Sequence, residues 1–420
     1  DRAVELVNRL SNNEYSAKVA MIAGYLRCNK IDDARKIFDR TRTDDVVCWN
    51  AMIGGYARSK RMDEAENLFD RMVRKDAIAW NTMVLGYAEI GDMANALRIF
   101  TKMKEKNTVS WNSLITGFMQ NGKFPEALKS VSVMMLEGSK PDHVTMVSGL
   151  SACGSIAASK AGEQLHNLAT KMGHLGDRKV SNALITMYSK CGRVASAEQV
   201  FRGIDGADVV SWNAMIGGYA LNGLGNDAVD LYETMLAKCI PPDEVTFVGV
   251  LSACSHSGMV MKGAEVFKSM TVEPAAEHVA CLVDMFGRSG RLREALGVVR
   301  DGGLNGNDAV WGSLLGACRV HGDAVVAREV NMRISEREGG RGWSSVLLSN
   351  INAECGKWVE VEDGRRSVAK QTGQSWVEVR NDVFGFASGG SPPSLAASAV
   401  RTLTAQMTTD MLPHSISYHA

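Results

Sequence analysis

Apolar residues recur along most of this chain at helical spacing, in paired segments separated by short polar turns. The first segment of a pair carries Ile/Leu-x-x-Tyr/Phe, as in Met52–Tyr56 and Met215–Tyr219. The second carries Ala-x-x-Leu/Val/Ile-Phe/Tyr, as in Ala65–Phe69, Ala96–Phe100 and Ala197–Phe201. Small alanines allow two helices to approach closely, while the larger side chains fill the space between layers. The pattern therefore predicts helix-turn-helix repeats.

The predicted repeats follow one another without interruption and have two lengths, 31 and 35 residues. They are Tyr15–Asp45, Val46–Asp76, Ala77–Asn107, Thr108–Asp142, His143–Asp177, Arg178–Asp208 and Val209–Asp243. Two helices in every repeat, stacked in tandem, are typical of an α-solenoid. Residues 1–14 predict the second helix of a partial repeat.

Five asparagines lie at the same position of these repeats. They are Asn50, Asn81, Asn112, Asn182 and Asn213, with spacings of 31, 31, 70 (twice 35) and 31 residues. Asparagine is a mediocre helix former that prefers caps and turns, so its recurrence near the start of a helix indicates that the side chain is used. Each stacked repeat would present one polar group at one register.

Composition is globular, with 45% hydrophobic and 22% charged residues. A chain of 420 residues is too long for one compact core, but a repeat array avoids that limit because each repeat packs on its neighbours. Lys+Arg and Asp+Glu both total 47, so the formal net charge is zero. This counts against a strongly basic nucleic-acid binder, although a neutral total is compatible with a basic groove and an acidic back.

The nine cysteines are scattered and never form Cys-x-x-Cys, which indicates small buried residues in a reducing compartment. No stretch approaches the roughly 20 apolar residues of a membrane span, so no membrane association is expected. The chain begins at Asp1 without Met, so the lack of a targeting peptide in it is uninformative.

No motif indicates enzyme chemistry. His-x-Glu and Cys-x-x-Cys are both absent, which removes the zinc deaminase signature. There is no P-loop, dinucleotide fingerprint or serine nucleophile elbow. We therefore expect no catalytic residue, no metal and no cofactor.

Four segments resemble the pentatricopeptide repeat family, specifically the plant subclass that mixes long, standard and short repeats. They are VVSWNAMIGGYALNG (209–223), SNALITMYSKCGRVASAEQVF (181–201), KPDHVTMVSGLSACGSI (140–156) and PDEVTFVGVLSACSHSG (242–258). The variable period argues against tetratricopeptide repeats, which keep about 34 residues. The resemblance implies an all-α, right-handed solenoid of helix-turn-helix repeats over residues 15–308, and it extends to about Phe386.

Beyond the repeats the chain resembles the E-type extension of that subclass, which occurs in factors for cytidine-to-uridine editing of organellar transcripts. The matching segments are VDMFGRSGRLREAL (283–296), VWGSLLGACRVHGD (310–323), LLSNINAECGKWVEV (347–361) and SWVEVRNDVFGF (375–386). A helical, repeat-like extension is thus expected at 309–386. The segment between Met270 and Glu277 is shorter than the family pattern. Residues 387–420 match poorly and are expected to form a degenerate or flexible tail.

In the family, the fifth and last residues of a repeat select one base, with Asn/Asp favouring uracil and Asn/Asn cytosine. An asparagine amide has the donors and the acceptor that a pyrimidine edge requires, and modular repeats bind about one base each. The pairs here are Asn50/Asp76, Asn81/Asn107, Asn112/Asp142, Asn182/Asp208 and Asn213/Asp243. The alternative is that each Asp caps the next helix and each Asn supports contacts between repeats. Both roles can coexist. Repeats with an apolar fifth residue should contribute little; these residues are Val19, Val147, Val248 and Ala280.

Two further sets of residues recur at a fixed distance from the asparagine position. Three residues before the asparagine position stand Val47, Ile78, Val109, Val144, Val210 and Val245, which the family uses to clamp bases. Ordinary packing of a helix start explains them equally well, and Ser16 and Lys179 interrupt the row. Eight residues after that position stand the phosphate-contact candidates Arg27, Arg58, Lys190 and Arg288. A solvated surface is the alternative, and Glu89, Gln120 and Leu221 interrupt that row.

The resemblance implies a monomeric solenoid that binds single-stranded RNA in a mitochondrion or chloroplast. Its extension would recruit a deaminase-bearing editing protein in trans. The expected RNA pattern, from 5′ to 3′, is unread–U–C/U–U–unread–U–U. The alternatives are an RNA stability or splicing factor and a helical scaffold that binds a peptide; an enzyme in its own right is the least favoured.

Overall fold

The computed structural model describes residues 14–41, 45–301, 308–337, 342–356, 374–379 and 382–387. The chain divides into an N-terminal part, residues 1–310, and a C-terminal part, residues 311–420. The N-terminal part contains the predicted repeats.

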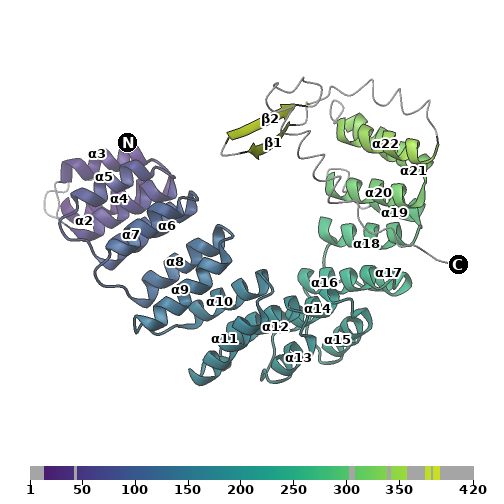
Figure 1. Ribbon diagram of the computed structural model, residues 1–420, viewed down its shortest axis with the longest axis horizontal. Coiled ribbons are helices and arrows are strands. Elements are labelled where there is room, and N and C mark those ends of the chain that lie inside the picture. Colours follow the sequence, from purple (N-terminus) through teal and green to yellow (C-terminus); the bar gives the residue numbers. More distant parts are fainter. Residues whose placement is uncertain are drawn as a thin grey trace. The chain divides into compact units, whose positions relative to one another are not determined.

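Each repeat of the N-terminal part is a hairpin of two helices joined by a short turn (Figure 1). The first helices are α2 (Glu14–Arg27), α4 (Val46–Arg58), α6 (Ala77–Glu89), α8 (Thr108–Gln120), α10 (His143–Ser155), α12 (Arg178–Lys190), α14 (Val209–Leu221), α16 (Glu244–His256) and α18 (Ala276–Arg288). The second helices are α3 (Ile31–Thr41), α5 (Met62–Arg71), α7 (Met93–Lys102), α9 (Phe124–Leu136), α11 (Ser159–Lys171), α13 (Val194–Arg202), α15 (Gly225–Ala237), α17 (Val260–Lys268) and α19 (Leu292–Asp301). A 3-10 turn, η1 (His174–Gly176), precedes α12.

The helices pack in a regular order that confirms the predicted all-α solenoid. Each first helix contacts the first helix of the next repeat and the second helix of its own. Each second helix from α3 to α17 also contacts the first helix that follows it. Aromatic rings meet edge to face at that contact, with centroids 4.7 Å apart for Phe100–Trp111 and 5.1 Å for Phe201–Trp212. Such pairs add about 1 kcal/mol to the burial of the rings.

Glycines allow successive first helices to lie very close together. A Cβ added to Gly117 would stand 2.7 Å from the Ala88 Cβ, and one added to Gly218 would stand 2.3 Å from the Ser189 hydroxyl. Real side chains essentially never approach so closely. At α8 and α14 the close approach to the preceding first helix therefore depends on the absence of a side chain at this position.

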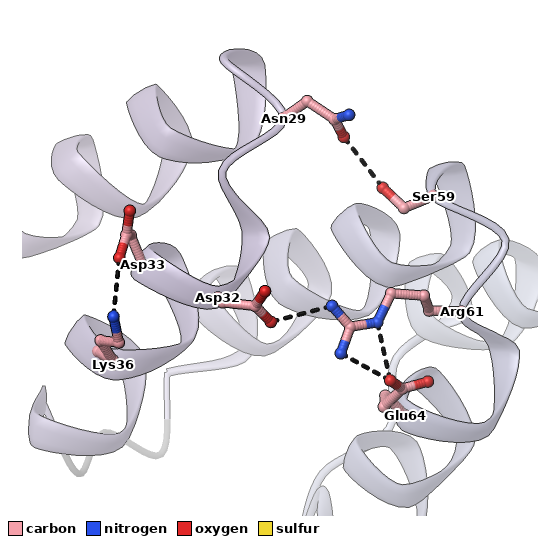
Figure 2. Close-up of polar contacts among 7 residues, drawn as sticks. All are labelled: Asn29, Asp32, Asp33, Lys36, Ser59, Arg61 and Glu64. Carbon is pink, nitrogen blue, oxygen red and sulfur yellow. Dashed lines mark hydrogen bonds and ion pairs between the residues drawn. The ribbon is translucent and has the colours of Figure 1, made fainter.

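Polar contacts join the turns of neighbouring repeats. Figure 2 shows the first of these, in which Arg61 donates to Asp32 of the preceding repeat at 2.9 Å and to Glu64 on its own helix at 2.7 Å. Nearby, the Ser59 hydroxyl donates to the Asn29 amide oxygen at 3.2 Å. Each of these exposed contacts contributes little to stability. Together they join the turn of one repeat to the turn of the next.

The C-terminal part begins within α20 (Asp308–His321). It continues with α21 (Ala324–Arg337), α22 (Gly342–Glu354) and two antiparallel strands, β1 (Gln374–Val379) and β2 (Asp382–Ala387). Gln374 pairs with Ala387 and Val379 with Asp382. The prediction of a wholly helical extension at 309–386 is therefore wrong for its last segment. The physical reason is composition: Trp376, Val377 and Val379 are followed by Val383, Phe384 and Phe386, and aromatic and β-branched residues favour strands.

Two terminal predictions fall almost entirely outside the described residues. Of the predicted partial repeat at 1–14 only Glu14 is described, where it begins α2. Of the predicted tail at 387–420 only Ala387 is described, at the end of β2.

Within the described ranges, no helix is long and apolar enough to cross a membrane, and no cluster of His, Cys, Asp and Glu is arranged to hold a metal ion. Cys48, Cys153, Cys254 and Cys318 are buried, as predicted, whereas Cys28 and Cys239 are exposed. Burial raises the pKa of the Cys153 and Cys254 thiols to about 11, so both are neutral at physiological pH.

Candidate nucleic-acid interface

The residue that ends each repeat caps the first helix of the next. These caps are Asp45, Asp76, Asn107, Asp142, Asp177, Asp208 and Asp243, and each accepts a backbone N–H of the helix it precedes. The Ala79 N–H donates to Asp76 Oδ1 at 2.9 Å, and the Thr246 N–H donates to Asp243 Oδ1 at 2.9 Å. An N-cap of this kind stabilises a helix by about 1 kcal/mol. The capping role proposed from sequence is confirmed.

The structure joins three of the five predicted pairs by direct hydrogen bonds. Asn50 Nδ2 donates to both carboxylate oxygens of Asp76 at 3.0 Å. Asn112 Nδ2 donates to both oxygens of Asp142, at 3.0 and 3.1 Å, and Asn213 Nδ2 donates to Asp243 Oδ1 at 2.8 Å. Apart from the exposed Asn107 and the buried Asn81, the members of the five pairs are half-buried. Each bonded pair crosses from one first helix to the start of the next.

No hydrogen bond between described residues joins the other two pairs. Asn107 Oδ1 accepts the Ser110 N–H and hydroxyl, both at 2.9 Å, which leaves its amide nitrogen for another partner. Asp208 Oδ1 accepts the Ser211 N–H at 3.0 Å, and Asp208 Oδ2 lies 3.7 Å from the Arg178 guanidinium. Their partners Asn81 and Asn182 occupy the same position of the repeat as the other asparagines but form no hydrogen bond with the capping residue.

Two of the capping carboxylates, Asp142 and Asp243, are held in the charged form. Burial by itself would raise the pKa of Asp142, but the Thr145 N–H and the Asn112 amide bind its oxygens and bring the pKa below the usual value. The same balance of burial against bonds from Thr246 and Asn213 lowers the pKa of Asp243. These groups are therefore hydrogen-bond acceptors at neutral pH.

The row of aliphatic residues predicted to contact bases faces solvent. The exposed fractions are 62% for Val47 and Ile78, 59% for Val109 and Val210, 61% for Val245 and 39% for Val144. Packing of a helix start, the alternative reading of this row, requires burial and does not account for such exposure. A periodic line of exposed apolar side chains next to polar pairs is a surface that fits a ligand.

The phosphate-contact candidates are all exposed, but they differ in their partners. Arg27, Arg58 and Lys190 have no ion pair within the part of the chain that the structure describes. Arg288 is paired with Asp284 on its own helix at 2.9 Å, so its charge is partly neutralised. The spacing of four residues between Asp284 and Arg288 on one helix is the sequence signal for that pairing.

A hollow that sequence reasoning missed lies beside two of the capping residues. It has a volume of about 650 Å³, and Asp76, Asn107 and Glu105 line it together with four lysines, Lys75, Lys102, Lys104 and Lys106. Lys106 lies 3.5 Å from Glu137, and Lys75 donates to the Met72 carbonyl, whereas Lys104 is exposed. Basic residues concentrate here although the whole chain is neutral.

Comparison with known families agrees with these boundaries. The pentatricopeptide repeat model matches residues 19–46, 47–76, 78–108 and 180–207, and the pentatricopeptide repeat family model matches 106–155 and 207–271. The matched segments coincide closely with the helical hairpins. The chain belongs to the pentatricopeptide repeat family.

Several plant members of the family are similar in sequence. The chloroplast pentatricopeptide repeat-containing protein CRR2 of Arabidopsis thaliana is 40% identical over 259 residues, which cover 60% of this chain and 39% of CRR2. A mitochondrial pentatricopeptide repeat-containing protein of the same plant is 38% identical over 274 residues, covering 61% of this chain and 43% of the relative. The chain thus spans less than half the length of these relatives.

Solved structures show the same fold. The pentatricopeptide repeat protein PPR10 from maize is 17% identical with a TM-score of 0.55, over 87% of this chain and 55% of PPR10. PPR10 in complex with an 18-nucleotide psaJ RNA element has a TM-score of 0.59, over 84% of this chain and 60% of that protein.

Proposed function

We propose that this pentatricopeptide repeat protein binds single-stranded RNA and selects its sequence, with one base contacted by each competent repeat. The observation that carries the proposal is the recurrence of an Asn and a helix-capping residue at one register, beside a row of exposed aliphatic side chains. The 18-nucleotide RNA bound by the structurally similar PPR10 supports the choice of ligand. The valines would contact base faces, and the polar pairs would contact base edges.

The cap explains how the last residue of a repeat selects a base. In these capping residues Oδ1 is committed to the helix N-terminus, so the second terminal atom is the one with capacity left for a ligand; in Asp76 and Asp142 it accepts, among the described residues, only the amide of the paired asparagine. That atom is a carboxylate oxygen in Asp142 and an amide nitrogen in Asn107. Uracil has a hydrogen on N3 and needs an acceptor, whereas cytosine N3 is itself an acceptor and needs a donor. Asp should therefore favour uracil and Asn cytosine.

The predicted RNA follows from these assignments. Repeats with Asn50, Asn112, Asn182 and Asn213 select uracil, and the repeat with Asn81 and Asn107 selects cytosine or uracil. Repeats with Val19 or Val147 have no hydrogen-bonding side chain at the fifth position and only space the array. The pattern is unread–U–C/U–U–unread–U–U.

We further propose that the protein is a monomeric site-recognition factor for organellar cytidine-to-uridine editing. The resemblance of residues 283–386 to the E-type extension supports this, and the names of its relatives place them in chloroplasts and mitochondria. The deaminase would come from a partner protein in trans. In a plant line that lacks the protein, a cytidine a few nucleotides downstream of a matching pyrimidine run should remain unedited. Changed transcript abundance or splicing with normal editing would instead identify a stability or splicing factor.

RNA selectivity is tested by direct binding at fixed salt, about 150 mM, because RNA affinity depends on ionic strength. Two labelled single-stranded RNAs are compared: one carries the pyrimidine pattern and the other has purines at the recognised positions. We expect tighter binding of the first, and a smaller preference in Asn112→Ala, which removes one of the five recognised positions. Equal affinities for both RNAs in the wild-type protein would contradict sequence selection, and absence of binding to either RNA would favour a peptide-binding scaffold.

A further inference from the structure

The five asparagines differ in what binds the amide oxygen. The Thr145 hydroxyl donates to Asn112 Oδ1 at 2.6 Å, and the Thr246 hydroxyl donates to Asn213 Oδ1 at 2.6 Å. Both threonines are fully buried. In Asn50, Asn81 and Asn182, by contrast, Oδ1 is buried and has no hydrogen-bond donor among the described residues.

The difference lies in one residue, the third of the following first helix. This residue is threonine in α10 and α16, where Thr145 and Thr246 stand, and it is Ala79, Ser110 or Ser211 after the other three asparagines. The Ser110 and Ser211 hydroxyls donate to the capping residue instead, at 2.9 and 3.0 Å. The Thr145 and Thr246 hydroxyls also lie 3.0 and 2.9 Å from their capping carboxylates, so the contact with the asparagine oxygen is what the two serines lack.

The single hydroxyl proton of Thr246 lies near two acceptors. Asn213 Oδ1 is 2.6 Å away and Asp243 Oδ1 is 2.9 Å away. Asp243 Oδ1 already accepts the Thr246 N–H and the Asn213 amide, while Asn213 Oδ1 has no other donor among the described residues. The proton therefore belongs to the asparagine oxygen, which is also the nearer one. Thr145 stands between Asn112 and Asp142 in the same way.

The asparagine side chains therefore fall into three groups, according to how many ends of the amide are hydrogen-bonded. Asn112 and Asn213 are held at both ends of the amide, by an aspartate at Nδ2 and a threonine at Oδ1. Asn50 is held only at Nδ2, by Asp76. Asn81 and Asn182 are held at neither end by any described residue. A half-turn of the amide exchanges its donor and its acceptor, which reverses the pattern that separates uracil from cytosine.

We propose that the third residue of the following first helix is a specificity-determining position, at which Thr145 and Thr246 fix the amides of Asn112 and Asn213. The proposal rests on the function proposed above. Discrimination of uracil from cytosine is sharpest at the bases of Asn112 and Asn213, intermediate at that of Asn50, and weakest at those of Asn81 and Asn182. Thr145 and Thr246 are positioning residues, because they act through asparagine and touch no base.

The test uses the full chain and synthetic RNAs of the predicted pattern, with uracil or cytosine at one position at a time. Thr246→Ser keeps a hydroxyl able to cap the helix, as Ser110 and Ser211 do. We expect the uracil-to-cytosine affinity ratio to fall about three- to tenfold at the base of Asn213, the size of one hydrogen bond, with the ratio at the base of Asn112 unchanged. The reciprocal variant Ser211→Thr should raise the ratio at the base of Asn182 by a similar factor.

Two results overturn the inference in distinguishable ways. If Asn213→Ala abolishes discrimination at its base while Thr246→Ser and Ser211→Thr change nothing, the threonine role is wrong and the proposed function stands. If Asn213→Ala also leaves discrimination unchanged, base recognition itself fails. A parallel change at every base would show a general loss of folding and would likewise refute a local positioning role.

Discussion

At the scale of single residues, the capping residue of each repeat has two roles that are assigned to two different atoms. Oδ1 binds the helix N-terminus, and the second atom distinguishes aspartate from asparagine. Aspartate and asparagine are nearly equal as N-caps. The base preference of a repeat is therefore free to change without loss of the helix start.

Asp142→Asn should convert a uracil-selecting repeat into one that favours cytosine. The amide nitrogen then faces the base where a carboxylate oxygen stood, and a change of about 1–3 kcal/mol in relative affinity is expected at that position. Binding of RNAs with uracil or cytosine at the base of Asn112 measures it. Asp177→Asn is the matched control, because Asp177 also caps a helix but its repeat has Val147 in place of Asn. An unchanged base preference in Asp142→Asn would contradict the assignment.

The lowered pKa values of Asp142 and Asp243 predict a loss of stability in acid. Their ordinary pKa is 3.8 and the folded values lie below it, so the stabilisation is complete above pH 3.8 and disappears as the pH falls through the folded pKa. The free energy of unfolding, measured by urea denaturation, should fall more steeply below about pH 4 in wild type than in Asp142→Asn/Asp243→Asn. Parallel curves for the two proteins would show that these carboxylates are not the groups responsible.

The pairs of asparagine and capping residue could be predicted from the sequence, but the hydrogen bonds to the asparagine oxygens could not. The spacing of 31 and 35 residues brings three of the five asparagines into hydrogen-bond contact with their capping residues, because helical repeats convert a fixed period into a fixed register. The hydroxyl of Thr246 was not predictable in the same way. Serine and threonine look alike in a polar pattern, and only the three-dimensional structure shows that the Thr246 hydroxyl reaches the asparagine oxygen whereas the Ser211 hydroxyl contacts the capping residue alone.

At the scale of helices, the exposed aliphatic row lies near the start of successive first helices. These side chains make little contribution to the core, so a polar substitution should be nearly neutral for folding. The sequence predicted this row from its phase, but exposure was the property that separated ligand contact from ordinary packing.

Val210→Ser should weaken RNA binding while leaving the unfolding midpoint almost unchanged. Loss of apolar contact with a base is expected to cost about 1 kcal/mol, or roughly fivefold in affinity. Titration of the matched RNA and thermal unfolding measure the two effects. Leu136→Ser is the control, since Leu136 is 85% exposed at the end of a second helix and lies outside the row. Equal effects of the two substitutions on affinity would contradict the base-contact role.

The hairpin β1–β2 shows where helical periodicity was a poor guide. The segment around Trp376 resembled the extension as a whole, and the prediction carried the helical character of 309–354 forward into it. Aromatic and β-branched residues favour a strand over a helix. The two strands accordingly pair over six residues each. The family resemblance located this segment in the extension, whereas its local composition determines that it forms strands.

At the scale of the whole molecule, a net charge of zero coexists with unpaired basic residues on the first helices. Arg58 is exposed and has no ion pair within the described residues, whereas Arg288 is neutralised by Asp284. Total charge was thus a weak indicator of ligand class, because charges that are paired with each other do not act on a distant phosphate.

Arg58→Ala should weaken binding of all RNAs about equally and reduce the slope of log affinity against log salt by about one. Affinities measured from about 50 to 200 mM salt provide the slope. Arg288→Ala is the matched comparison, and a smaller change is expected because its charge is already paired. A selective loss at one base in Arg58→Ala would show that this residue recognises sequence instead of backbone.

Close packing at Gly117 and Gly218 fixes the distance between neighbouring first helices, and the caps tie each repeat to the next one. A repeat consequently completes its own recognition site only with atoms that belong to its successor. When arrays are shuffled, duplicated or shortened by recombination, a transplanted repeat keeps its asparagine but acquires a different threonine, serine or alanine from its new neighbour. The base preference of a repeat would thus depend partly on its neighbour, and an array of identical repeats, in which every asparagine has the same residue after it, would hold all its amides to the same degree.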